Sequence, residues 1–413
     1  MLLKLGWKNI IKRPFSSGLS VVLLASSIMI IVLASLTMQQ LKDKFDENAN
    51  KIDLVVGAKG SRLQMVLCNV FHIDNPTGNI KFKDVDFLSK HPFVKSAIPI
   101  SLGDSYKSYR IVGTELSYIN DLYKATLNKG RLFQNTLEVV AGANVSDQLG
   151  LKIGDRFYGS HGIEESIHDH DNFEYEVVGI LNSSGETIDN LLLTSLESVW
   201  DVHPEDHQNG SFDLIEEHEH HHHHEHSKEV SQNNKEITAM LINYNSPRAK
   251  FSIPGLVNKK QQMIAAEPAI EIQQLLELVQ PVIRVVSVLA WIIFGLAFFS
   301  IVITMINSMK DRKYEIAMMR VAGASYKMVL IAILIEGFVI ALGGSFFGIL
   351  FGHLLMELMG EYLTSSYHYQ FTGLIYNTFE GWLIFGTLIT GMVSALFPAI
   401  SAYKIDISIT LKE

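Results

Sequence analysis

Cysteine is nearly absent from this sequence, and positive charge is not in excess. The 413 residues contain one cysteine, Cys68, which excludes an internal disulfide framework. The formal net charge is −9, so the chain gives no support to nucleic-acid binding, which would require a basic face. We therefore expect neither a domain held together by disulfides nor a nucleic-acid partner.

Motifs for catalysis and for nucleotide binding are also absent. The sequence has no G-x-x-x-x-G-K-[ST] phosphate loop, so it cannot bind ATP in that manner. With a single cysteine, it has no C-x-x-C frame for a defined zinc site. No spacing indicates a Ser/His/Asp, a Cys/His or a paired-carboxylate centre. We expect a protein that is not itself an enzyme and binds no cofactor directly.

Long apolar runs are what the chain has in abundance. Hydrophobic residues make up 48% of it and charged residues 19%, which is too apolar for one ordinary soluble domain. Four runs each hold about 20 or more mostly apolar residues, enough at about 1.5 Å per residue to cross a bilayer. They are 17–38, 282–306, 328–355 and 382–403. No small-residue cleavage site follows the first run, so we expect an uncleaved membrane anchor.

Basic residues predict how the four helices are oriented. Segments 1–16, 307–327 and 404–413 carry lysine or arginine, whereas the short connection 356–381 carries neither. Short loops rich in basic residues remain on the cytoplasmic side of a membrane. The prediction is that both termini and 307–327 are cytoplasmic, while 39–281 and 356–381 lie on the outer side.

The outer segment 39–281 is long enough for a domain with its own core or for two small subdomains. Its pattern is mixed, because 137–141 and the β-branched run 175–181 predict strands. Asn144 is expected to cap a short helix that ends at Leu149. The expected fold class is an α-helical membrane protein with four transmembrane helices, one plus three, and a large mixed α+β domain inserted between the first and the second.

Histidines are concentrated in one part of this outer segment. Twelve of the sixteen lie between residues 161 and 226, and 203–227 is so polar that we expect a mobile loop. Neutral imidazoles bind Zn²⁺ and other transition metals, so weak, exchangeable metal binding is predicted, with a tolerated polar insertion as the alternative. The predicted ligands are His161, His168, His170, His203, His207, His218, His220, His221, His222, His223, His224 and His226.

The charged peptide 307–327 lies between two of the most apolar runs. Helix formers extend to Ala322 and Gly323 provides a stop, which predicts a short amphipathic helix at the membrane face. Ser325 is expected to cap the helix that follows. The simplest alternative is a solvated loop that only fixes topology, but apolar side chains mixed with charged ones favour a docking surface.

Several stretches resemble one family of membrane proteins. Residues 312–325, RKYEIAMMRVAGAS, are similar to the coupling helix of MacB/FtsX/LolCDE-type ABC transporter permeases. WKNIIKRP at 7–14 resembles the amphipathic helix that leads into the family's first span. VVAGANVSDQLGLKIGD at 139–155 resembles part of its periplasmic core domain, and PAISAYKIDISITLK at 398–412 its C-terminal tail. The family tail has proline after the aspartate, where this chain has Ile407.

This resemblance implies a domain plan, a location and partners. It implies a MacB-like periplasmic core domain at 39–281, an FtsX-like permease domain at 282–413, and a place in the bacterial inner membrane. Such permeases form dimers of two copies or paralogues, and a separate cytoplasmic ABC ATP-binding subunit carries the ATPase activity. A periplasmic or outer-membrane partner is also expected. The residues implied in docking the ATP-binding subunit are Arg312, Glu315, Ile316, Met319, Arg320 and Gly323.

Two features of the third run point to helix packing. Gly344, Gly348 and Gly352 recur every four residues, and such a small-residue stripe lets another helix approach closely, within the chain or between two copies. Glu336 is an intramembrane carboxylate. We expect it to pair with a basic group of a neighbouring helix rather than to act as a proton relay.

The sequence thus predicts a permease subunit that transmits movement. ATP hydrolysis by the partner subunit would shift the membrane helices and thereby move the outer domain, which acts on a lipoprotein, a peptide or an amphiphilic compound. One alternative is an envelope system that handles or senses zinc through the histidine-rich loop. The other is a signalling scaffold that activates an envelope enzyme and transports nothing.

Overall fold

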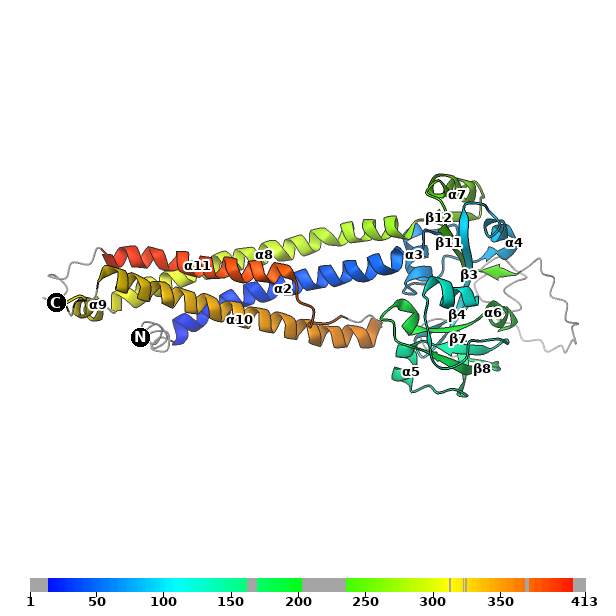
Figure 1. The fold of residues 1–413 in the computed structure, drawn as a ribbon, viewed down its shortest axis with the longest axis horizontal. Coiled ribbons are helices and arrows are strands. Elements are labelled where there is room, and N and C mark those ends of the chain that lie inside the picture. The colour runs from blue at the N-terminus through cyan, green and yellow to red at the C-terminus, as the bar shows by residue number, and fades with distance from the viewer. Residues whose placement is uncertain are drawn as a thin grey trace, which may run out of the picture. The chain divides into compact units, whose positions relative to one another are not determined.

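The structure is a computed structural model that describes residues 14–161, 169–202, 235–311, 313–321, 323, 325–367 and 371–403. These residues form two compact units (Figure 1). The α/β unit consists of Asp43–Leu276, and the helical unit is built from the chain on either side of it. The fold class predicted from the sequence is confirmed, because a large mixed domain is inserted between the first and the second of four apolar helices.

Four long helices build the helical unit. They are α2 (Pro14–Ala49), α8 (Pro268–Asp311), α10 (Tyr326–Tyr367) and α11 (Thr378–Tyr403). Each contains a stretch long and apolar enough to cross a membrane. The helices are longer than the apolar runs, since a helix continues wherever its backbone hydrogen bonds continue, even where polar side chains replace apolar ones. α10 therefore extends into the connection 356–381, which the sequence analysis had taken as a loop.

Apolar and small side chains hold these helices together. A core that includes Leu24, Ile28 and Val32 of α2 also contains buried residues of α8, α10 and α11. Hydroxyl groups add polar contacts between α2 and α8: Ser20 Oγ lies 2.9 Å from Ser300 Oγ. Such hydrogen bonds between helices stabilise packing where lipid offers no competing partner.

The α/β unit contains a ten-stranded sheet in the order β12-β1-β11-β3-β4-β9-β6-β8-β5, with β7 paired to both β3 and β8. These pairings close a ring, β3-β4-β9-β6-β8-β7, which returns to β3. A ring of this kind leaves no free edge among its members. The strands are β1 (Leu54–Ala58), β3 (Val94–Tyr106), β4 (Tyr109–Thr114), β5 (Leu127–Gly130), β6 (Glu138–Ala141), β7 (Arg156–His161), β8 (Asp169–Leu181), β9 (Leu191–Ser195), β11 (Ala239–Tyr244) and β12 (Met263–Ala266).

Two separate apolar cores stabilise the α/β unit. The ring encloses one of them, which contains Tyr109, Val139, Phe157, Tyr175 and Leu192. The other lies on β1, β11 and β12 and is covered by helices. The helices of this unit are α3 (Arg62–Val70), α4 (Phe82–Val85), α5 (Ala143–Leu149), α6 (Leu196–Val202) and α7 (Ala249–Asn258), and a further pair of strands is β2 (Ile80–Lys81) with β10 (Glu236–Ile237).

One local expectation was wrong. β6, α5 and β8 lie where the sequence predicts them, but Asn144 does not cap α5. The residue that precedes the helix is Gly142, which has extended backbone angles. Asn144 lies inside the first turn, and its Nδ2 donates to Asn190 Oδ1 at 2.9 Å. The side chain is therefore used to hold α5 against a neighbouring turn rather than to satisfy the helix's own N–H groups.

Candidate functional site

A short helix, α9 (Lys313–Val321), connects α8 to α10. Gly323 follows it with φ of +93°, a left-handed conformation that glycine adopts without strain, and its N–H donates to Arg320 O at 3.1 Å. Ser325 Oγ then accepts the N–H of Met328 at 3.4 Å, at the start of α10. α9 thus ends sharply, and it lies at the same end of the bundle as the start of α2 and the end of α11 (Figure 1).

The side chains of α9 separate into a covered and an open face. Ala317 is 1% exposed, so this position is pressed against other residues of the unit. Tyr314, Met318 and Val321 are 61%, 49% and 63% exposed. Their spacing of four and three residues places them on one side of the helix. We call these three residues the α9 stripe. An open apolar stripe beside charged residues has the composition of a protein-binding surface.

The residues that the sequence assigned to docking lie in and around this helix. Arg312 lies outside the described residues. Glu315, Ile316 and Met319 belong to α9, and Arg320 is half-buried in its last turn. The α9 stripe consists of other residues, because Tyr314, Met318 and Val321 were not among those assigned to docking. Their spacing of four and three residues is visible in the sequence and could have indicated them.

The glycine stripe of α10 packs against α2 within the chain. A Cβ atom added to Gly344 would lie 2.6 Å from Leu24 Cδ2, and one added to Gly348 would lie 2.7 Å from Ile28 Cβ. At Gly352 the distance to Val32 Cγ1 would be 3.0 Å. The three positions therefore let α2 approach the backbone of α10, which is the intramolecular alternative considered from the sequence.

Glu336 lies buried in α10, with 7% of its surface exposed. Ser308 of α8, just before α9, donates a hydrogen bond to its Oε1 at 3.5 Å. The carboxylate is thus placed where α10 meets the end of α8. An ionisable group in this position connects two helices near the α9 end of the unit.

A second polar group surrounds the connection between α10 and α11. His353 of α10 contacts Gly373 O through Nδ1 and Glu380 Oε2 through Nε2, the latter at 2.9 Å. Glu380, in the first turn of α11, is 1% exposed. Its Oε1 accepts the N–H of Asn377 at 3.2 Å. We call His353, Glu357, Glu380 and the connection residues 371–377 the connection cluster.

The connection is also held by α2 and by a second carboxylate of α10. Gln40 binds both backbone groups of Thr372: its Nε2 donates to the carbonyl at 2.8 Å, and its Oε1 accepts the N–H at 3.0 Å. Asn377 Nδ2 donates to Gln39 Oε1 at 2.6 Å. Glu357 Oε2 accepts the N–H of Gly373 at 2.6 Å. Side chains of α2, α10 and α11 therefore all form hydrogen bonds with the short segment 371–377.

Sequence reasoning missed this cluster. The segment was assigned as a plain outer connection, and His353 was passed over inside its apolar run. The signal was present, because an ionisable residue within a membrane helix indicates a functional position by itself. The sequence does not show which residues meet the connection, because partners such as Gln40 and Thr372 are 332 residues apart.

The α/β unit also contains a histidine that is held neutral. His72 Nε2 lies 3.1 Å from the Tyr118 hydroxyl, and its backbone carbonyl accepts Arg110 Nε at 3.0 Å. Burial and, to a smaller extent, the Arg110 charge lower the pKa of His72 to about 3. Burial likewise raises the pKa of the nearby Cys68 thiol to about 12. A weakly basic imidazole and a thiol that stays protonated are not suited to act as base and nucleophile.

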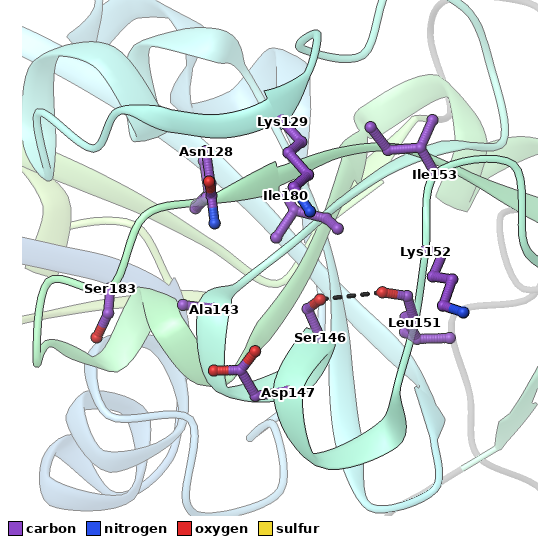
Figure 2. Close-up of a pocket in the computed structure, with 11 residues that line it drawn as sticks. Asn128, Lys129, Ala143, Ser146, Asp147, Leu151, Lys152, Ile153, Ile180 and Ser183 are labelled. Carbon is purple, nitrogen blue, oxygen red and sulfur yellow. Dashed lines mark hydrogen bonds between the residues drawn. The ribbon is translucent and has the colours of Figure 1, made fainter.

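A cavity of about 410 Å³ lies beside β5 and α5 (Figure 2). Its volume falls in the range of small-ligand pockets. Its wall includes Ser146 of α5, whose Oγ donates to Leu151 O at 3.0 Å. Asn128, Lys129 and Asp147 around it are exposed. Because the buried hydroxyl is already used and the other polar groups face solvent, the cavity does not have the features of a catalytic centre.

The predicted histidine ligands lie almost entirely outside the described residues. His168 and the nine histidines between 203 and 226 are among those not described. His161 ends β7 and His170 lies in β8. Within the described part of the chain, no group of three or more His, Cys, Asp or Glu side chains is close enough to hold a metal ion.

Comparisons with known proteins identify both parts of the chain. The model of the MacB-like periplasmic core domain matches residues 17–222, and that of the FtsX-like permease C-terminal domain matches residues 287–407. No curated relative matches the chain.

Two solved structures were found as neighbours. The periplasmic region of MacB from Actinobacillus actinomycetemcomitans is similar at 16% identity and a TM-score of 0.35, over 57% of this chain and 98% of that one. The extracellular domain of the ABC-type transporter YknZ from Gram-positive bacteria is similar at 12% identity and a TM-score of 0.30, over 51% of this chain and 98% of that one. From the two family models, the chain belongs to the MacB/FtsX-type ABC transporter permeases.

Proposed function

We propose that this chain is the membrane subunit of an ABC system that converts ATP hydrolysis by a separate ATP-binding subunit into movement of its outer domain. The observation that carries the proposal is the α9 stripe. Tyr314, Met318 and Val321 present apolar surface between two membrane helices, next to Arg320. A bound ATP-binding subunit would cover this surface and transmit its closure directly to α8 and α10.

The mechanism requires that each state of the ATP-binding dimer prefers one arrangement of the membrane helices. α8 and α10 flank α9 on both sides, so a shift of α9 acts on both helices at once. Glu336 and Ser308 link the same two helices close to α9. Support for transmission rather than solute passage comes from the apolar character of the four helices.

The proposed location is a bacterial inner membrane, with both termini and α9 in the cytoplasm and the α/β unit in the periplasm. The basic residues of 307–327 and their absence from 356–381 support this orientation. A second copy or a paralogue completes the permease. α8 is the natural contact for it, because 17% of its most apolar window is buried within the chain, compared with 39–44% for the other three spans.

The proposed cargo is something held outside the membrane: a lipoprotein, a peptide or an amphiphilic compound. The α/β unit, Asp43–Leu276, would supply the surface for such an extracytoplasmic partner. The signalling-scaffold alternative uses the same movement but ends on an envelope enzyme. The two differ in one measurable outcome, since only transport displaces cargo from the membrane when ATP is supplied.

Docking is tested by co-purification of the ATP-binding subunit with variants of α9. We expect Met318→Glu and Glu315→Arg each to reduce the amount recovered at least about tenfold. Met318→Glu places a charge in an apolar contact, and Glu315→Arg reverses the sign of a charge. Phe251→Glu is the matched control, since Phe251 is 90% exposed and lies in the α/β unit. Unchanged recovery with both α9 variants, or the absence of any ATP-binding protein from the wild-type preparation, contradicts the proposal.

Metal handling is the second candidate function, supported by the density of histidines between 161 and 226. The backbone register adds one observation: Asp104 of β3 is paired with His161 of β7. Zinc titration of the full chain tests it. Binding that is tighter than millimolar, and that deletion of 203–226 weakens, supports a metal function. A chain that binds no zinc below millimolar rules it out.

A further inference from the structure

The hydrogen bonds of His353 fix how many protons the connection cluster holds. The carbonyl of Gly373 can only accept, so Nδ1 of His353 must carry a hydrogen. A neutral imidazole has only that one N–H, which would leave the lone pair of Nε2 facing the carboxylate of Glu380 at 2.9 Å. Two acceptors cannot face each other at this distance. A further proton must therefore lie between His353 and Glu380.

The surroundings of the pair make that proton important. Glu357 adds a second carboxylate to the same connection through Gly373. The groups that α2 contributes are uncharged: Gln39, Gln40 and Ser35. Within 371–377 itself, the titratable side chain is that of Tyr376, which is 65% exposed. A protonated His353 is thus the cation found among these described contacts, and it faces one carboxylate directly and a second across Gly373.

We propose that His353 and Glu380 form a proton-binding site that fastens the α10–α11 connection. With the proton bound, His353 holds Gly373 and Glu380 together, so the connection stays on α10, α11 and α2. Without it, Nε2 and the carboxylate repel each other, and the hydrogen bonds of Thr372 and Asn377 loosen. Acid therefore fastens the connection and alkali releases it. This site is independent of docking at α9, and either proposal can fail without the other.

Glycine at position 373 makes the fastening tight. A Cβ atom at Gly373 would lie 2.1 Å from His353 O and 3.1 Å from Glu357 N. The connection therefore rests directly on the backbone of α10, and the imidazole reaches it without an intervening water. Because the segment 371–377 lies this close to α10, loss of the single proton weakens the contacts of the whole segment.

The test measures amide hydrogen exchange of 371–377 in the full chain, in detergent or nanodiscs, between pH 5 and 9, corrected for intrinsic exchange rates. In the wild type, we expect protection to fall at least about tenfold as the pH rises through the titration of the pair. Glu380→Gln should keep the protection and lose the pH dependence, because an amide N–H can donate to Nε2 of a neutral imidazole. Glu361→Gln, an exposed change on the same helix, should behave as the wild type.

A complementary variant separates the proton from the contact. His353→Ala should lose protection across the whole pH range. If that variant does not fold, Glu380→Gln alone decides the matter. The proposal is overturned if wild-type protection is constant from pH 5 to 9, or if Glu380→Gln retains the wild-type pH response.

Discussion

Single residues decide how closely the helices of this protein approach each other. At Gly348 a methyl group would meet Ile28 Cβ at 2.7 Å and the backbone oxygen of Ala25 at 2.9 Å. Gly343, five positions before it on α10, has no atom nearer than 3.9 Å to its added Cβ. The two glycines look alike in the sequence, and only the position of α2 distinguishes them.

Gly348→Ala is therefore expected to destabilise the helical unit, while Gly343→Ala is not. Forcing a methyl group against a neighbouring backbone costs about 1–3 kcal/mol, because α2 and α10 must move apart. The thermal unfolding midpoint of the detergent-solubilised chain measures the difference. Equal midpoints for the two variants would contradict the close packing of α2 on this stripe.

The neutral His72 gives a pH-dependent prediction at the same scale. Its folded pKa of about 3 lies below the unfolded value of about 6.5, so the unfolded chain binds a proton that the folded chain does not. Protonation of His72 therefore has no effect on the free energy of unfolding well above pH 6.5. As the pH decreases from 6.5 toward 3, it lowers this free energy by at most about 1.4 kcal/mol per pH unit.

His72→Asn tests this prediction. Asparagine tolerates the positive φ of 56° at this position and cannot be protonated. The variant should be less stable at pH 8, through lost packing, but should lose less stability than the wild type between pH 6.5 and 5. Urea unfolding at several pH values, followed by circular dichroism, provides the measurement. Parallel pH curves for the two proteins would show that folding does not lower the pKa of His72.

At the scale of elements, connections are fixed by side chains that bind several backbone groups. The turn between β5 and β6 is an example. Arg131 forms a two-pronged ion pair with Glu138, with both N···O distances at 2.6 Å. The N–H groups of Gln134 and Asn135 donate to the same carboxylate at 2.8 and 3.2 Å. One acidic side chain therefore organises the whole turn.

Glu138→Gln should loosen this turn and alter the acid stability of the α/β unit. Hydrogen bonding to Arg131 holds the pKa of Glu138 well below its usual value. A carboxyl group with a lowered folded pKa contributes stability above about pH 4.5, which is lost as the pH falls below that value. We expect Glu138→Gln to cost about 1.5 kcal/mol at pH 7, and we expect this cost to shrink steadily as the pH falls below about 4.5. Unfolding curves measured from pH 7 down to pH 2 provide the test. A variant with the same stability as the wild type at pH 7 would contradict this account.

The strands and helices differ in how well the sequence predicts them. β6 and β8 were found from β-branched runs, and α9 from its helix formers and Gly323, because these depend on neighbours in the chain. The ring β3-β4-β9-β6-β8-β7 was not found. It depends on β3 being long enough to pair with the next strand, β4, and also with β7 and β11, which are distant in sequence. No local pattern encodes such a closure.

At the scale of the whole molecule, the single cysteine offers a direct test of orientation. Cys68 is fully buried, and burial raises the pKa of its thiol to about 12, so it should not react with maleimides in the folded protein. Introduced cysteines can therefore be followed against a silent background.

Phe251→Cys and Lys327→Cys place a thiol on exposed positions of the α/β unit and of the start of α10. In intact cells with a permeable outer membrane, an impermeant maleimide should label Phe251→Cys at least about tenfold more than Lys327→Cys. Opening the inner membrane should equalise the two. Labelling of Lys327→Cys in intact cells would reverse the predicted topology.

The sequence by itself determined the four membrane helices, their expected direction and the short helix between the second and the third. Helices depend on hydrogen bonds between near neighbours and on local apolar composition, and both are visible in the chain. Only the tertiary structure decided what covers Gly348, which groups hold the connection 371–377, and where His353 finds Glu380. These contacts join residues up to 342 positions apart, such as Asn377 and Ser35. Packing at that separation depends on the shape of the whole helical unit, which no local stretch of sequence contains.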